Sequence, residues 1–430
     1  MTPTRPTYRS ALRIRQFRLL LAGHGIGTVA QLMLTLALGI EVLEQTGSGG
    51  WLSVTVALGF VPYVLASGYA GLLADRHSRS AMLTVSFVTR AGCAALLALG
   101  LPLHWPVPLL VAVAAIAAVL ATPSYPALAA ATVQCVPDEQ LPPANALVTG
   151  VENVTWMAGP GVLGVLLLFG AGPSVGTATA TALFLVAALL SAQVRLPRPP
   201  REPADVGAWR ELRAGLHAVA RVAAVRRPMS VAVIDNFLYG YVVVAMVLLA
   251  DAVFGGEQGI GLLNAALSVG GVLALLPLNT LAARFRPAAV LMAVMTAFAA
   301  ATIALGLSGW VVLSVVLVGL AGATSLVAEV TAVTLLQRAA PEELTARVFG
   351  VYDQLNVGAL AFGSLIAGPL ADAMGPGTAM VAVASVCLLL AGVATWRLRE
   401  PAHPGRHAAV RSSRWTGRPA MASGAVSRPG

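Results

Sequence analysis

Long apolar segments recur along the whole chain, and they constrain its fold more than any other feature. A segment of about 20 apolar residues is long enough to cross a membrane as an α-helix, whereas the strands of membrane β-barrels alternate in polarity over about 10 residues. Composition agrees, because 57% of the 430 residues are hydrophobic and 10% are charged, against roughly 25% charged residues in a typical soluble domain. The sequence therefore predicts an all-α polytopic membrane protein.

Twelve membrane-spanning helices are predicted, six on each side of a polar linker at 196–229. The linker begins with a run of Pro and Arg and continues with the spacing of an amphipathic helix that lies on the inner leaflet. We expect a cytoplasmic N-terminal arm (1–16), a six-helix bundle (17–195), this linker, a second six-helix bundle (230–396) and a disordered cytoplasmic tail (397–430). The predicted spans are 17–43, 51–73, 81–101, 107–130, 144–170, 176–195, 230–252, 259–282, 288–307, 310–336, 347–373 and 377–396.

An internal repeat supports the division into two six-helix halves. When the chain is shifted by 203 positions, polar residues of the loop and helix after the fourth span coincide with those after the tenth. Parallel repeats of this kind are an architecture of membrane transporters. The matched polar pairs are Gln134 and Gln337, Glu139 and Glu342, and Asn153 and Asn356.

The basic residues determine the predicted topology. The formal net charge is +9, and all 27 basic residues are Arg. Twelve spans place every Arg except Arg90 on one face, which the positive-inside rule makes cytoplasmic, with both termini on that side. The charge therefore indicates topology and contact with anionic membrane lipids, and no nucleic-acid partner. The three cysteines (Cys93, Cys135, Cys387) lack the spacing of a metal site, so we expect no metal and no cofactor.

The loop after the second span reads Gly71-Leu72-Leu73-Ala74-Asp75-Arg76-His77-Ser78-Arg79. It resembles the loop signature of the major facilitator superfamily in Gly71, Asp75, Arg76 and Arg79, although Ser78 replaces a Gly and Ser80 a basic residue. The resemblance implies a conformational latch in which Asp75 faces the positive end of a helix in the other half. A polar turn with topogenic arginines is the alternative interpretation.

Two further segments resemble bacterial drug and siderophore exporters of this superfamily. One is the loop from Gln337 to Gly350, and the other begins at Ala144–Leu147 and continues to Gly159, Pro160 and Gly164. The second segment is similar to an antiporter motif, although Thr155 replaces its leading Gly and its closing Gly pair is offset by one. The same residues would kink and thin the helix for tight packing in any polytopic protein.

Ionisable side chains inside a span are costly and mark functional candidates. At 1.5 Å per residue, five of them lie about 8 to 12 Å from the cytoplasmic ends of their helices. Because burial favours the neutral form of a carboxyl group, such acids can load and release protons as access alternates. A structural hydrogen bond or ion pair is the alternative role for each. The proton-coupling candidates are Asp235, Glu329, Asp353, Glu152 and His24.

Arg90 is a sixth ionisable residue at membrane depth, and we expect it to form an ion pair with a buried acid, for which Glu152 matches in depth. The superfamily resemblance implies a central cavity between the halves. Its expected lining mixes polar and aromatic side chains with aliphatic ones, which suits amphipathic ligands. The polar and aromatic candidates are Gln31, Tyr63, Tyr125, Asn236 and Tyr239.

These features predict a secondary active transporter that works by alternating access. We expect a monomer in the bacterial inner membrane that exports small amphipathic compounds, such as drugs, antibiotics or siderophores, in exchange for protons. An importer or facilitator of a small metabolite is the alternative on the same fold. A membrane-embedded lipid-modifying enzyme is disfavoured, because the sequence shows no metal-spaced His and Glu residues and no motif for acyl transfer. The absence of a phosphate-binding loop likewise disfavours an ATP-driven pump.

Overall fold

The computed structural model describes residues 7–65, 78–196, 223–254, 257–340 and 345–397. Within these ranges the chain is built from helices and short connections, without strands. Eleven helical segments of the described chain are long and apolar enough to cross a membrane, and Gly49–Leu58 is a shorter apolar helix. The predicted second span (51–73) and the linker run into residues outside these ranges. The prediction of an all-α polytopic membrane protein is confirmed.

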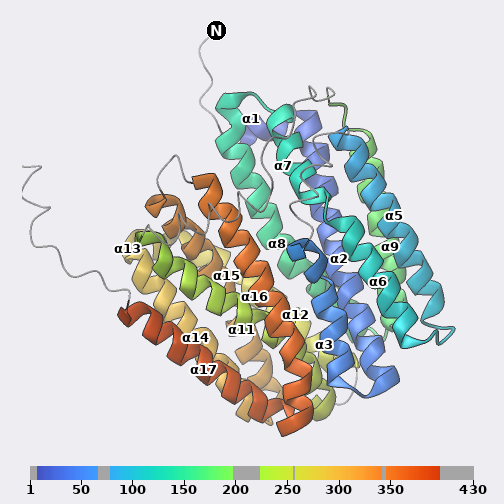
Figure 1. Cartoon of the computed structure of the whole chain (residues 1–430), viewed down its shortest axis with the longest axis vertical. Helices are drawn as coiled ribbons and strands as arrows, with labels where there is room; N and C mark the ends of the chain where they lie inside the picture. Colours follow the sequence, from blue (N-terminus) through green and yellow to red (C-terminus); the bar gives the residue numbers. More distant parts are fainter. Residues whose placement is uncertain (1–6, 66–77, 197–222, 255–256, 341–344, 398–430) are drawn as a thin grey trace, which may run out of the picture.

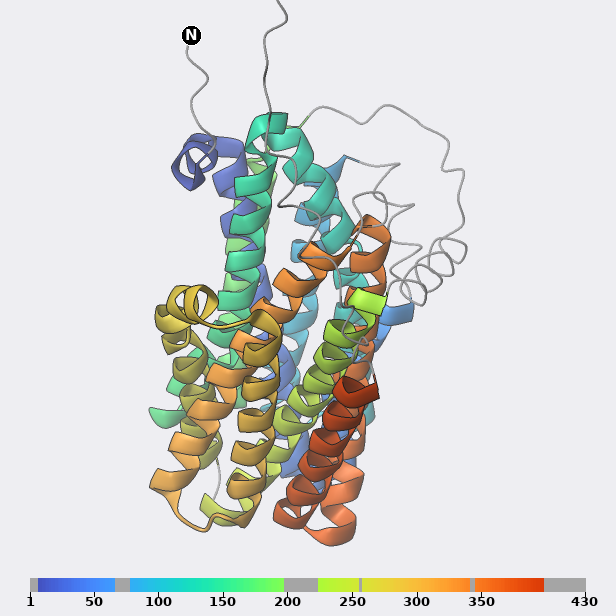
Figure 2. The same ribbon diagram turned by 90° about the vertical axis from the view of Figure 1, so that its left-hand side faces the viewer.

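The helices form two groups that lie side by side, one from each half of the chain (Figures 1 and 2). The first group comprises α1 (Tyr8–Arg13), α2 (Arg15–Thr46), α3 (Gly49–Leu58), α5 (Arg79–Gly100), α6 (Val107–Ala121), α7 (Ser124–Cys135), α8 (Leu141–Leu168) and α9 (Pro173–Ala192). The second group comprises α11 (Ala223–Phe254), α12 (Glu257–Leu273), α13 (Leu275–Arg284), α14 (Pro287–Leu307), α15 (Val311–Ala339), α16 (Thr345–Met374) and α17 (Pro376–Arg397).

Two predicted spans are interrupted in the structure. The span predicted at 107–130 consists of α6 and α7, which meet at Pro123. The span predicted at 259–282 consists of α12 and α13, and α12 ends at Leu273. Proline explains both breaks, because Pro123 and Pro277 lack the backbone N–H that would continue the hydrogen-bond ladder.

The N-terminal arm contains a helix that the sequence analysis did not predict. Helix α1 begins with a capping box, in which the side chains of Thr7 and Ser10 each form a hydrogen bond with the backbone of the other residue. An extended residue, Ile14, separates it from α2. The Ser10 hydroxyl also donates to Oε1 of Gln140 at 2.7 Å, so α1 is tied to the start of α8.

The backbones of the two halves come into close contact where α8 crosses α12. A Cβ atom at Gly164 would lie 2.6 Å from the carbonyl oxygen of Gly261, and one at Gly261 would lie 2.7 Å from that of Gly164. Small residues on both sides let the two backbones touch, as is common between membrane helices. Gly164 therefore contributes to the contact between the halves.

A second contact joins the halves at the end of the molecule remote from α1. The carboxylate of Asp372 on α16 accepts hydrogen bonds from the backbone N–H groups of Gly49 (3.3 Å) and Gly50 (3.2 Å) at the start of α3. The hydroxyl of Ser53 accepts from the N–H of Gly368 at 2.7 Å. An acid at a helix N-terminus is favourable, so these bonds hold α3 and α16 together at this end.

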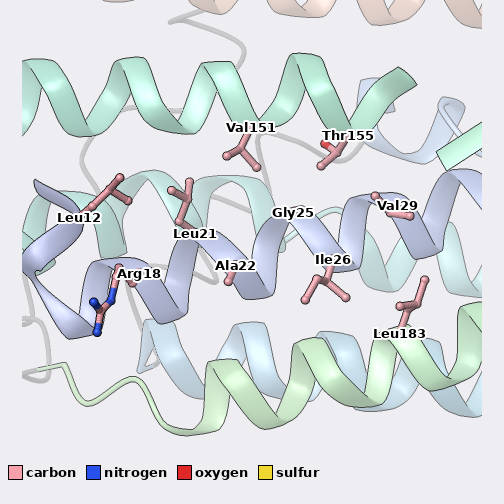
Figure 3. A pocket seen from close by; sticks show the side chains of 10 residues that line it. All are labelled: Leu12, Arg18, Leu21, Ala22, Gly25, Ile26, Val29, Val151, Thr155 and Leu183. Atoms are coloured by element: carbon pink, nitrogen blue, oxygen red, sulfur yellow. The ribbon is translucent and has the colours of Figure 1, made fainter. Parts of the chain in front are cut away.

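Helix α2 carries a groove on its outer side, where it lies between α8 and α9 (Figure 3). The groove has a volume of about 510 Å³ and extends from Arg18 to Val29. Ala22, which lines it, is exposed. The groove therefore opens on the surface of the first half.

Candidate functional site

Glu329 forms the centre of a polar cluster in the second half. Its Oε1 accepts a hydrogen bond from the Tyr352 hydroxyl at 3.0 Å, and its Oε2 accepts one from Nδ2 of Asn236 at 3.3 Å. The three residues come from α15, α16 and α11 respectively. Both donors are neutral, so among the described residues the hydrogen bonds to this carboxylate involve no cationic side chain.

Asp235 precedes Asn236 on α11 and is more deeply buried, with 2% of its surface exposed. One carboxylate oxygen, Oδ1, has no hydrogen-bond partner in the part of the chain that the structure describes. Leaving a charged oxygen unsatisfied inside a protein is costly, whereas a protonated carboxyl avoids most of that cost. The geometry of Asp235 therefore suits a group that carries a proton.

Asp353 links the second half to the first. The hydroxyl of Tyr63, in the helical stretch after α3, donates a hydrogen bond to Oδ2 of Asp353 on α16. The ring of Tyr63 meets the ring of Tyr125 edge-on, with centroids 6.0 Å apart. Asp353 thus lies where the two halves meet, nearer to the α1 end than the contact at Asp372.

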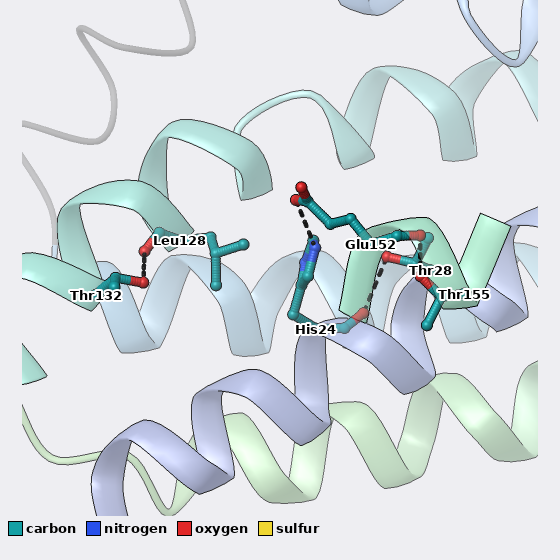
Figure 4. A network of polar contacts seen from close by, with 6 residues as sticks. All are labelled: His24, Thr28, Leu128, Thr132, Glu152 and Thr155. Carbon is teal, nitrogen blue, oxygen red and sulfur yellow. Dashed lines mark hydrogen bonds and ion pairs between the residues drawn. The ribbon is translucent and has the colours of Figure 1, made fainter. Parts of the chain in front are cut away.

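His24 and Glu152 form the polar pair of the first half (Figure 4). Nε2 of His24 on α2 lies 3.1 Å from Oε1 of Glu152 on α8, and the two side chains are 11% and 17% exposed. Thr28 donates to the carbonyl of His24 and Thr155 to that of Glu152, each at 3.0 Å. The pair joins α2 to α8 within the first half.

Arg90 does not form the predicted ion pair with Glu152, whose carboxylate contacts His24 instead. The guanidinium lies over the rings of Phe87 and Phe184, 4.6 and 5.0 Å from their centroids. Its Nε donates to the Ser86 carbonyl at 3.3 Å, and Nη2 reaches Oγ of Ser124 at 3.5 Å. Among the described residues, cation–π contacts and neutral acceptors therefore take the place of the expected acid.

Of the predicted cavity residues, Tyr239 lines a small cavity of about 40 Å³ between the halves. The other lining residues include Trp156 and Pro160 on α8, and Phe60 stacks on Trp156 with ring centroids 5.9 Å apart. Gln31 lies on α2, where its Nε2 donates to Oγ1 of Thr35 at 3.4 Å. The remaining candidates, Tyr63, Tyr125 and Asn236, lie beside the acids rather than in this cavity.

The structure describes the predicted packing motif but only one residue of the predicted latch. A Cβ atom at Gly159 would lie 2.6 Å from Cβ of Leu32 on α2, so this residue packs within the first half. Of the latch, Arg79 begins α5 and its Nη1 donates to the Ala130 carbonyl at 3.4 Å. The remaining latch residues, Gly71, Asp75 and Arg76, lie outside the described residues.

Tyr352 is a site residue that the sequence analysis missed. It precedes Asp353 on α16, and its hydroxyl donates a hydrogen bond to Glu329 on α15. An aromatic residue beside an acid inside a span was the available signal. In the described part of the chain, no group of three or more His, Cys, Asp and Glu residues is arranged to hold a metal ion.

Two bacterial exporters are similar to the chain in sequence. Enterobactin exporter EntS of Escherichia coli O1:K1 / APEC is 28% identical over 387 residues, which cover 88% of this chain and 90% of that protein. Macrolide efflux protein A of Streptococcus pyogenes is 28% identical over 152 residues. That second match covers 35% of this chain and only 38% of the macrolide efflux protein.

Solved transporter structures share the fold. The nucleoside transporter NupG matches with a TM-score of 0.67 and 14% identity over 91% of this chain and all of that chain. A bacterial homologue of the human lysosomal transporter Spinster, in an inward-facing and unoccupied conformation, matches with a TM-score of 0.64 and 14% identity over 93% and 97% of the two chains. The family model of the Major Facilitator Superfamily matches residues 20–353 and 229–429. With two packed helical halves and this match, the chain belongs to the major facilitator superfamily of membrane transport proteins.

Proposed function

We propose that this transporter exports small amphipathic compounds across a bacterial inner membrane in exchange for protons, as a monomer that works by alternating access. The superfamily establishes a transporter and not an enzyme. Export is supported by the two similar exporters, which carry different compounds according to their names. The drug-, antibiotic- or siderophore-like nature of the cargo is inferred from those relatives and from the aromatic residues near the acids.

The arrangement of Glu329 is the observation that carries proton coupling. Its carboxylate is held by Tyr352 and Asn236, which are neutral. A proton can therefore bind to Glu329 without breaking an ion pair among the described residues. Asp235, with its unpartnered oxygen, and Asp353, at the junction of the halves, provide two further carboxylates.

Alternating access assigns a role to the bond between Tyr63 and Asp353. The bonds at Asp372 and Ser53 hold the halves together at the end remote from α1. Relative motion of the halves that opens that end would also displace Tyr63 on one half relative to Asp353 on the other, so their bond would have to break or re-form. Protonation of Asp353 would weaken the bond, because a neutral carboxyl accepts a hydrogen bond less strongly than a carboxylate. The proton would thereby favour the change of access.

The test is transport by the purified full chain in proteoliposomes that enclose a pH-sensitive dye. With a macrolide as the probe, an acidic lumen should drive accumulation, and the dye should report proton release as the macrolide enters. A protonophore should abolish both signals. Macrolide accumulation that does not depend on the pH gradient would contradict proton coupling, although the protein would still be a transporter.

Direction is tested in an efflux-deficient bacterial host. Expression of the chain should lower the cellular content of the macrolide, or of enterobactin as the second probe, and an exporter requires a lower content for at least one of them. A higher content in expressing cells would instead establish the alternative, an importer on the same fold.

A further inference from the structure

The groove on α2 has an apolar floor that is not part of the site between the halves. Its floor follows one side of α2 through Leu21, Gly25 and Val29, and its walls come from α8 and α9 (Figure 3). Gly25 lets α8 approach, because a Cβ atom there would lie 2.9 Å from Val151. Apart from Arg18 and Thr155, every lining side chain is apolar.

Positive charge is concentrated at one end of this groove. Arg18 lines its mouth, and Arg9, Arg13 and Arg15 precede it, all four being exposed. The first acid of the entire sequence is Glu41, near the opposite end of α2. Asp138 and Glu139 lie close to α1 through the bond between Ser10 and Gln140, but they do not line the groove.

The length of the groove matches one leaflet of a bilayer. From Arg18 to Val29, α2 rises about 16 Å at 1.5 Å per residue. The hydrocarbon core of a membrane is about 30 Å thick, so the groove covers roughly half of it. The arginines then lie at the level of the lipid headgroups, where each basic residue favours anionic lipid.

We propose that the groove between α8 and α9 binds an anionic phospholipid, with one acyl chain along Leu21, Gly25 and Val29 and the phosphate at Arg18. The apolar floor would accept the chain, and the guanidinium would pair with the phosphate. The neighbouring arginines add to the preference for an anionic headgroup. This site is separate from the cluster around Glu329 and does not depend on the proposed proton exchange.

Native mass spectrometry of the purified full chain in detergent tests the assignment. The probes are phosphatidylglycerol and phosphatidylcholine with identical acyl chains. The unmodified chain should retain one phosphatidylglycerol under activation that removes phosphatidylcholine. Arg18→Gln should weaken retention of phosphatidylglycerol about fivefold, the factor that corresponds to about 1 kcal/mol per basic residue near an anionic surface. Ala22→Trp should reduce retention of both lipids, because Ala22 is exposed in the groove and a large ring would fill it.

Arg286→Gln is the matched control, since Arg286 is also exposed and precedes a membrane helix, α14, but lies outside the groove. It should retain phosphatidylglycerol like the unmodified chain. Equal retention of the two lipids, or unchanged retention in both Arg18→Gln and Ala22→Trp, would overturn the proposal. A dimer that disappears in Ala22→Trp would assign the groove to a second copy of the chain. If a macrolide displaced phosphatidylglycerol, the groove would instead be a binding site for the transported compound.

Discussion

The two halves of the molecule hold their membrane-depth acids in different ways. In the first half, Glu152 faces His24, a side chain that can carry positive charge. In the second half, Glu329 faces Asn236 and Tyr352, which cannot. Protonation of Glu152 would give up its interaction with a charged His24, whereas protonation of Glu329 would not break an ion pair. We therefore propose structural support for the first pair and proton exchange for the second cluster.

The largest expected effect comes from replacing Glu329, the central acid of the cluster in the second half, with a neutral residue. Glu329→Gln keeps the shape of the side chain and removes the titratable group. Proton-driven accumulation in proteoliposomes should fall about 100-fold, the low end of what a positioned proton-transfer group contributes. Exchange of labelled for unlabelled macrolide at equal pH should persist, because it requires no net proton movement.

Glu139→Gln is the control for this variant, since Glu139 is an exposed acid in the short turn before α8. It should transport normally. If Glu329→Gln retained full proton-driven transport, Glu329 would not be a carrier. Loss of exchange as well would indicate a role in folding or cargo binding, and the contrast between the halves would lose its main support.

A smaller effect is expected from the bond that connects the two regions. Tyr63→Phe removes the hydroxyl that donates to Asp353 but keeps the ring against Tyr125. A hydrogen bond to a charged group contributes about 1.5–3 kcal/mol, so turnover should change about tenfold. Single-molecule fluorescence between labels on the two halves should report a shifted distribution of conformations. Tyr8→Phe, at an exposed tyrosine on α1, should change neither quantity.

Removing the contact between His24 and Glu152 in the first half should reduce transport less than the changes above. Glu152→Gln removes the acid that contacts His24 while keeping the shape of the side chain. We expect transport to fall about threefold, in line with the 0.2–1 kcal/mol of a partly exposed ion pair. The double variant His24→Gln/Glu152→Gln should be no worse than the single one, because the two residues act through one contact. A loss as large as that of Glu329→Gln would show that both halves exchange protons.

The helices could be predicted well because hydropathy is a signal along one dimension. The span predicted at 81–101 is α5 (Arg79–Gly100), and the one predicted at 288–307 is α14 (Pro287–Leu307). The breaks could not be predicted with the same success. Pro160 lies inside α8 without ending it, whereas α7 begins directly after Pro123. Neighbouring helices decide whether a proline kinks or ends a helix in a membrane, and the sequence does not reveal those neighbours.

The candidate acids could be located by depth from the sequence, but the residues that they contact could not. Depth along a helix follows from residue number, and by depth Glu152 suited both Arg90 and His24. Rotation about each helix axis decides which of them it meets. That rotation depends on packing between segments far apart in the chain, and the structure places His24 at Glu152. Tyr352 was missed for the same reason, since its contact with Glu329 requires the relative placement of α15 and α16.

Arg90 provides the smallest expected effect and tests whether all ionisable groups of the first half are structural. It is 4% exposed and lies over two phenylalanine rings without contact to Glu152. Replacing a buried charge by an apolar side chain of similar volume is often neutral or stabilising. Arg90→Met should therefore transport normally and change the apparent stability by less than about 1 kcal/mol, as measured by thermal unfolding in detergent. Arg90→Ala should be the less stable of the two, because it leaves a cavity between Phe87 and Phe184. If Arg90→Met folded but lost proton-driven transport, the first half would contain a functional charge, and the contrast with the second half would have to be redrawn.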